Sequence, residues 1–161
     1  GAGGAAIFLF ASEITIDGRI LVNGKGGTKE DKNDNSVEGG GGGGSGGSLT
    51  LSACKITFAT FGADIRLAAN GGNGGAGAIG QDLDDKPDRG ASGGGGGGGG
   101  IIWIQAEDDM GNTDTREKMR EKMQTLPGEG GAKQGTGQTG KKGTTQNNIR
   151  IRTCSRGGDD H

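Results

Sequence analysis

The chain has 161 residues, of which 28% are hydrophobic and 3% aromatic, and its 18 basic and 20 acidic residues give a net charge of −2. This composition excludes a nucleic-acid binder, because it offers no basic excess to neutralise phosphates. No apolar stretch approaches the ~18 residues that cross a bilayer, so we expect no membrane span. The low hydrophobic content also makes an ordinary close-packed core difficult to build.

Glycine accounts for 41 residues, and much of it stands in runs such as Gly39–Gly44 and Gly93–Gly100. A run of eight glycines has no side chain to bury and a high backbone entropy cost on ordering. Such runs are either flexible linkers or an ordered array held by backbone contacts. Each long run ends where a short β-like segment begins, and we expect the ordered array.

One pattern, aliphatic-x-aliphatic-x-small-x, occurs four times along the chain, at residues 7–12, 49–54, 102–107 and 149–154. Alternation with a period of two, rich in β-branched residues, predicts half-buried strands. The aliphatic positions of these strands are the predicted core or assembly residues: Ile7, Leu9, Leu49, Leu51, Ile102, Ile104, Ile149 and Ile151.

The first two copies belong to a longer unit. Each is followed by two further strand-like segments, which lie at 13–17 and 19–24 in the first unit and at 55–58 and 64–72 in the second. Turns separate these segments. Asn23-Gly24 and Asn70-Gly71 predict a further turn, because both residue types tolerate positive φ. Each unit therefore predicts three short strands followed by a glycine-rich excursion.

Three short strands per repeat predict an all-β fold, a parallel β-helix or solenoid-like column whose turns stack aliphatic residues on one another. The glycine runs would leave this column as excursions and pack as polyglycine II helices, since chains without Cβ atoms approach closely. Another sheet arrangement, such as a β-sandwich, and β islands in an irregular chain are the alternatives. We expect one repeat domain over residues 1–161, from a fragment or processed product of a longer protein, with units at about 4–46, 47–99 and 100–147 and the start of a fourth at 148–161.

A short amphipathic helix is predicted at Thr115–Leu126. Asp114 has the spacing of an N-terminal cap, and Met119, Met123 and Leu126 fall on one helical face. Pro127-Gly128 would end the helix. It would lie on the flank of the sheet column or, alternatively, bind a partner.

Three segments resemble ligand-binding motifs but lack a needed residue. Residues 135–142 have the spacing of a phosphate loop, but Lys142 replaces the hydroxyl residue that would hold magnesium. Residues 31–36 begin like a calcium loop, but Ser36 stands at the position of the turn glycine. Residues 71–76 lack the aspartate of a calcium-binding nonapeptide. A further acidic group, at Asp82, Asp84, Asp85 and Asp88, has no partnering histidine. We therefore expect solvated loops, no metal and no cofactor.

Catalytic residues are also not expected. The single histidine, His161, is the last residue, where a serine or cysteine triad is difficult to build. Cys54 and Cys154 each end a strand motif, in different repeats. They are either two small buried residues or a disulfide within or between chains. The sequence therefore predicts that the protein is not an enzyme.

The glycine run, Ser45-Gly-Gly-Ser48, the strand Leu49–Ala53 and the segment Ile65–Gly75 together resemble the glycine-rich repeats of large secreted or surface-attached proteins. In that family, β-helix turns alternate with glycine blocks. The resemblance covers residues 1–107, and residues 108–148 depart from it. It implies an extracellular or cell-surface scaffold or an adhesin-like stalk.

These observations favour a structural protein, a subunit that assembles with copies of itself into a surface fibre, filament or sheath. Solenoids need polar caps to remain monomeric, and the sequence has no obvious cap. The alternative is a binding module, either an adhesin stalk or tip or an ice-binding protein. Only Thr15, Thr50 and Thr57 recur in the predicted strands, so the outward threonine ladder of an ice-binding face is missing.

Overall fold

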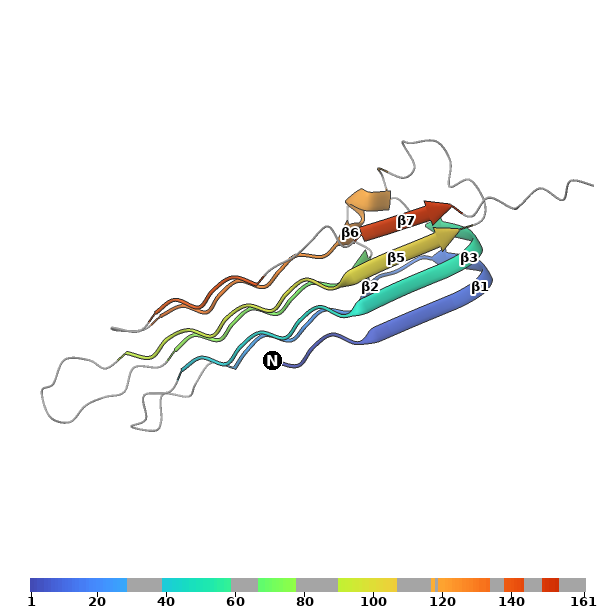
Figure 1. Ribbon diagram of the computed structural model, residues 1–161. Coiled ribbons are helices and arrows are strands. Elements are labelled where there is room, and N and C mark those ends of the chain that lie inside the picture. Colours follow the sequence, from blue (N-terminus) through green and yellow to red (C-terminus); the bar gives the residue numbers. More distant parts are fainter. Residues whose placement is uncertain are drawn as a thin grey trace, which may run out of the picture.

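The computed structural model describes residues 1–28, 39–58, 67–77, 90–106, 117, 119–133, 138–143 and 149–153. Its strands are β1 (Ala6–Ile16), β2 (Ile20–Leu21), β3 (Ser48–Phe58), β4 (Leu67–Ala68), β5 (Ile101–Ala106), β6 (Met123–Gln124) and β7 (Ile149–Thr153). They form a four-stranded sheet in the order β1-β3-β5-β7 and a three-stranded sheet in the order β2-β4-β6 (Figure 1). All pairs are parallel. The prediction of an all-β chain with parallel strands is confirmed.

The four copies of the aliphatic motif pair in register. Ile7 lies opposite Leu49, Leu49 opposite Ile102, and Ile102 opposite Ile149. Between consecutive strands of the larger sheet, the chain passes once through the smaller sheet. Equivalent residues of successive repeats therefore stack on each other.

The core includes aliphatic side chains from both sheets. Leu49, Leu51, Ile102 and Ile104 of the larger sheet and Leu67 of the smaller one are fully buried. Burying one such side chain stabilises the fold by about 1.5–3 kcal/mol. The core is small, as the composition requires, and it is built from the alternate positions of the predicted strands.

The edge of the larger sheet is less well covered. Ile7 and Ile14 of β1 are half-buried against the core, and Leu9 remains 39% exposed. Among the described strands, β1 has a neighbour, β3, on one side only. Its inward side chains therefore lack the second neighbour that buries their counterparts in β3.

The predicted turn between the first two strands of each unit is wrong, because β1 and β3 are each continuous over 11 residues. In β3 the buried positions run Leu49, Leu51 and Ala53, and then continue at Phe58. Cys54 and Lys55, both exposed, stand where this alternation changes parity. The strand thus changes the face that it buries at the one position, Ser12 opposite Cys54, where the register of β1 with β3 is interrupted, and the pairing resumes at Glu13 and Lys55.

The predicted helix at Thr115–Leu126 is confirmed only as a shorter helix. Glu117 and residues 119–121 are helical, residues 115 and 116 lie outside the described residues, and Met123 already belongs to β6. Pairing with β4 decides this: the N–H groups of Leu67 and Ala69 donate to the carbonyls of Lys122 and Gln124 at 3.0 and 2.9 Å. These bonds require an extended backbone where the side-chain period indicated a helix. Met119 of the helix packs in the core.

Candidate assembly surfaces

Seven extended segments run side by side away from the two sheets (Figure 1). The first layer, which precedes strands of the larger sheet, contains residues 1–5, 39–47, 90–100 and 138–143. The second layer, which follows strands of the smaller sheet, contains residues 22–28, 69–77 and 125–133. We call these seven segments the glycine bundle. Neighbours within a layer are parallel, and neighbours in opposite layers are antiparallel.

Hydrogen bonds in the glycine bundle repeat every three residues. Within the first layer, Gly40, Gly43 and Gly46 donate to the carbonyls of Ser92, Gly95 and Gly98 at 2.8–2.9 Å. Toward the second layer, Gly41, Gly44 and Gly47 donate to the carbonyls of Thr28, Lys25 and Val22 at 2.6–3.2 Å. The remaining residues, Gly39, Gly42 and Ser45, are exposed. Each central segment therefore has one position in three that faces outward.

Glycine is required at the other two positions because there is no room for a side chain. A Cβ at Gly43 would lie 1.9 Å from the carbonyl oxygen of Gly72, and one at Gly44 would lie 1.9 Å from that of Ala2. At the outward Gly42 the nearest atom would be 3.8 Å away, an ordinary contact. None of these three glycines has a positive φ. Close approach, and not conformational freedom, selects glycine in the bundle.

The requirement for glycine ends at both edges of the bundle. Ala2, Ala5 and Lys25 occupy the position equivalent to Gly44, but no described segment precedes theirs. At the opposite edge, Thr139 and Lys142 occupy the position equivalent to Gly43, with no described segment beyond them. All five residues are exposed. Their side chains stand where a further glycine segment would lie, so they close the bundle sideways.

Asparagine side chains cover the outward face of the second layer. The N–H of Asn70 donates to Oδ1 of Asn23 at 2.8 Å, and the N–H of Leu126 donates to Oδ1 of Asn70 at 2.8 Å. Asn70 also donates from Nδ2 to Gln124 and accepts at its carbonyl from Gly24, both at 2.7 Å. The prediction of turns at the two Asn-Gly pairs is therefore wrong. The asparagines instead supply acceptors to the outward N–H groups of the neighbouring segment.

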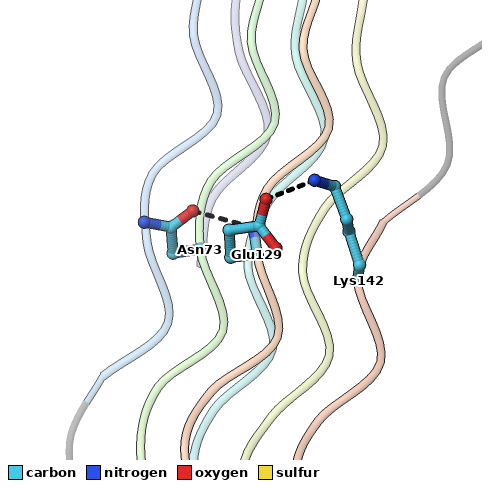
Figure 2. Close-up of polar contacts among 3 residues, drawn as sticks. All are labelled: Asn73, Glu129 and Lys142. Carbon is cyan, nitrogen blue, oxygen red and sulfur yellow. Dashed lines mark hydrogen bonds and ion pairs between the residues drawn. The ribbon is translucent and has the colours of Figure 1, made fainter.

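The same arrangement continues along the layer. Figure 2 shows the side-chain oxygen of Asn73 accepting the backbone N–H of Glu129, at 2.9 Å. The carboxylate of Glu129 forms an ion pair with Lys142 of the last segment. Both charged side chains are largely exposed, so this pair contributes little to stability. It does tie the edge segment to its neighbour.

The outer face of the four-stranded sheet carries exposed apolar side chains. Phe8 and Phe10 of β1 are 60% and 71% exposed, and Ile101 and Trp103 of β5 are also exposed. The register places Thr50 of β3 between Phe8 and Trp103 in one row. Clustered apolar groups on a surface are typical of an interaction site.

The predicted core or assembly residues fall into three groups. Leu49, Leu51, Ile102 and Ile104 are fully buried, Ile7 and Ile151 are half-buried, and Leu9 is partly exposed. For Ile149 the structure describes the backbone, which pairs with Ile102. Cys54 is exposed on β3, and Cys154 lies outside the described residues, so the candidate disulfide stays a prediction.

The motifs that resembled ligand sites are only partly described by the structure. Residues 31–36, 82–88 and 134–137 lie outside the described residues, while 71–76 and 138–142 are extended segments of the bundle. In the part of the chain that the structure describes, no three His, Cys, Asp or Glu residues are grouped to hold a metal ion. No described helix is long and apolar enough to span a bilayer.

The chain matches no known family model, no curated protein and no solved structure. The candidate surfaces are therefore identified from the structure alone, by their hydrogen bonding and exposure. They are the outward backbone of the first layer, the asparagine-covered face of the second layer, and the apolar outer face of the larger sheet. The signal that sequence inspection missed is the three-residue spacing of non-glycine residues inside the runs.

Proposed function

We propose that the protein is a structural, extracellular or cell-surface protein, a subunit that assembles with copies of itself into a fibre, filament or sheath. The observation that carries this proposal is the glycine bundle, in which two positions of three contact neighbouring backbones and only the third faces outward. Such an array suits a rigid, extended structural element, and it presents few side chains that could carry out chemistry. We assign the protein no catalysis, metal or cofactor.

We further propose that the seven segments are polyglycine II helices. A three-residue period is typical of this conformation, and the bundle's hydrogen bonds repeat at that spacing. Bonds to both parallel and antiparallel neighbours suit a helix that can donate in several directions around its axis. We also propose that the two parallel sheets are sides of one β-helix-type column, a proposal supported by the in-register stacking of the repeats.

Assembly needs a surface besides the closed edges of the bundle. The outer face of the larger sheet offers one, since Phe8, Phe10 and Ile101 are exposed there. Contact between copies would remove this apolar area from water, at about 25 cal/mol per Å². The resemblance to glycine-rich surface proteins supports the extracellular location.

Electron microscopy of the purified chain, together with sedimentation over a range of concentrations, tests the proposal. We expect filaments or sheets whose formation is concentration-dependent and weakened by Phe8→Ser with Phe10→Ser. The matched control is Thr57→Ser, a mild change of an exposed residue on β3. A monodisperse monomer at every concentration, with no ordered assemblies, would contradict the proposal of self-assembly.

The second candidate is a binding module such as an adhesin tip. It is favoured by the same outer face, where Phe8 and Trp103 lie in one row with Thr50 between them. Aromatic faces beside hydroxyl groups suit a ligand with an apolar side and polar edges, such as a sugar. A glycan array distinguishes the candidates. If the chain stays monomeric and binds a glycan, and Phe8→Ser abolishes that binding, the result favours the binding module.

A further inference from the structure

The outward face of the first layer carries backbone groups that have no hydrogen-bond partner among the described residues. The N–H groups of Gly39, Gly42, Ser45, Ser92, Gly95 and Gly98 point to no acceptor among the described residues. The carbonyls of the residues that follow them, Gly40, Gly43, Gly46, Gly93 and Gly96, likewise receive no N–H from that part of the chain. Donors and acceptors therefore both recur on this face with a period of three. We call it the open face.

The second layer shows that such a face can be closed. Its outward N–H groups at Asn70, Leu126 and Glu129 each donate to an asparagine side chain of the neighbouring segment. On the open face, one comparable bond exists among the described residues, from Gln138 at the edge to Ser92 Oγ at 3.0 Å. The central segments, 39–47 and 90–100, carry no asparagine at any position. The two faces of the bundle therefore differ in how their outward N–H groups are bonded: asparagine side chains accept several of them on the second layer, and no asparagine is present to do so in the central segments of the first layer.

Packing within the chain does not explain the glycines of the open face. A Cβ at Gly39, Gly42 or Gly95 would have its nearest neighbour at 3.5, 3.8 or 3.6 Å, which is ordinary contact. Outward positions of the second layer hold larger residues, including Asn73, Leu126 and Glu129. Glycine where a side chain would fit keeps the open face flat, which allows another backbone to approach it.

We propose that the open face binds the open face of a second copy of this chain, so that two bundles form a four-layered stack. The contact repeats one that each chain already contains, because its own two layers are joined by N–H to carbonyl bonds between antiparallel segments. A face with both donors and acceptors is self-complementary, as a two-fold interface requires. A two-fold axis perpendicular to the segments makes the facing segments antiparallel and places the two pairs of sheets at opposite ends.

The size of the open face indicates a reversible contact. With a rise of about 3.1 Å per residue and segments spaced as closely as sheet strands, its area is roughly 450 Å² per copy. About 900 Å² buried in total is at the low end for specific complexes, where association depends on concentration. A closed two-fold contact alone gives a dimer, so a filament needs the outer sheet face as its second contact.

The test converts the open face into the chemistry of the closed one. Gly42→Asn with Gly95→Asn adds side chains that cover the outward N–H groups and hold a second bundle away. Gly26→Asn is the matched control, since Gly26 is an outward glycine of the second layer whose Cβ would also meet only an ordinary contact, at 3.5 Å. At concentrations below those that give filaments, sedimentation velocity should show dimers for the native chain and for Gly26→Asn. For the double variant, the dimer dissociation constant should rise about a hundredfold or more.

This inference rests on the proposed self-association, and the outcomes separate the two. A native chain that is monomeric throughout overturns both. A native chain that associates as strongly as the double variant overturns only the open face as the contact. Hydrogen exchange on the native chain is independent of any variant: the amides of Gly42 and Gly95 should become protected as concentration rises, while that of Gly26 does not. Equal exchange of all three at high and low concentration would also overturn the inference.

Discussion

Replacing Gly43 by alanine tests the steric basis of the glycine bundle most directly. The added Cβ would lie 1.9 Å from the carbonyl oxygen of Gly72, far inside van der Waals contact, and this neighbour is backbone that has no rotamer to change. The two segments must therefore separate by more than 1 Å, as ordinary contact begins near 3.4 Å. That separation strains the bond from Gly97 N–H to the Gly72 carbonyl, now 2.8 Å.

The magnitude follows from two contributions. Overpacking by one methyl group costs about 1–3 kcal/mol. Each hydrogen bond weakened in the process costs about 1 kcal/mol more. We expect Gly43→Ala to lower the free energy of unfolding by about 2–4 kcal/mol. In a chain of this length that corresponds to a fall in Tm of about 2–4 °C per kcal/mol.

The matched control is Gly26→Ala, the same substitution at an outward position of the second layer. Its Cβ would meet only the Asn73 carbonyl, at 3.5 Å. Alanine restricts the unfolded chain, so this variant should be neutral or more stable by about 0.4–1 kcal/mol. Urea unfolding followed by circular dichroism, at a concentration where the chain is monomeric, measures both. Equal losses in the two variants would refute the assignment of inward and outward positions.

Two further predictions concern the asparagines and the core. Asn70→Ala removes two side-chain hydrogen bonds and should lower the free energy of unfolding by about 1–2 kcal/mol. A double-mutant cycle with Gln124→Ala should give a coupling free energy of about 0.5–1 kcal/mol. A coupling of zero would mean that the hydrogen bond between Asn70 and Gln124 is not made in solution. Ile104→Ala leaves a cavity at a fully buried position and should cost about 2–5 kcal/mol in thermal unfolding. Leu9→Ala, at the exposed edge, should cost less than half of that, and a similar loss would show that β1 is covered.

The strands were predictable because their sequence pattern and their burial have the same cause. Leu49 and Leu51 alternate with polar residues, and the same two side chains are the ones that the sheet buries. Their register with Ile102 and Ile104 follows from repeating the pattern. Local periodicity was sufficient here because the strands use it directly.

The predictions that were wrong concern segments in which contacts with residues distant in sequence override the local structural preference. Met119 and Met123 have helical spacing, but pairing of β6 with β4 makes Met123 extended. Asn70-Gly71 has the residues of a tight turn, but the side chain of Asn70 instead accepts the outward N–H of Leu126 in the neighbouring segment. Neither partner is visible from the local sequence.

The candidate surfaces were predictable only in part. The ordered glycine runs and their excursion from the strands follow from where the runs stand in the repeat. Which glycines face outward does not, since a run such as Gly93–Gly100 gives no sign of its phase. The spacing of Asn70 and Asn73, three residues apart between glycines, carries that phase and could have located the outward face of the second layer.

The uniformity of the run Gly93–Gly100 has a mechanical consequence. Sliding this segment by three residues, about 9 Å, brings identical groups opposite one another, so the run itself does not favour one alignment over the next. Ser92 at one end and β5 at the other are what hold the alignment. Under tension along the bundle axis, a segment released from its strand can lengthen in steps, re-forming its hydrogen bonds after each step instead of unravelling.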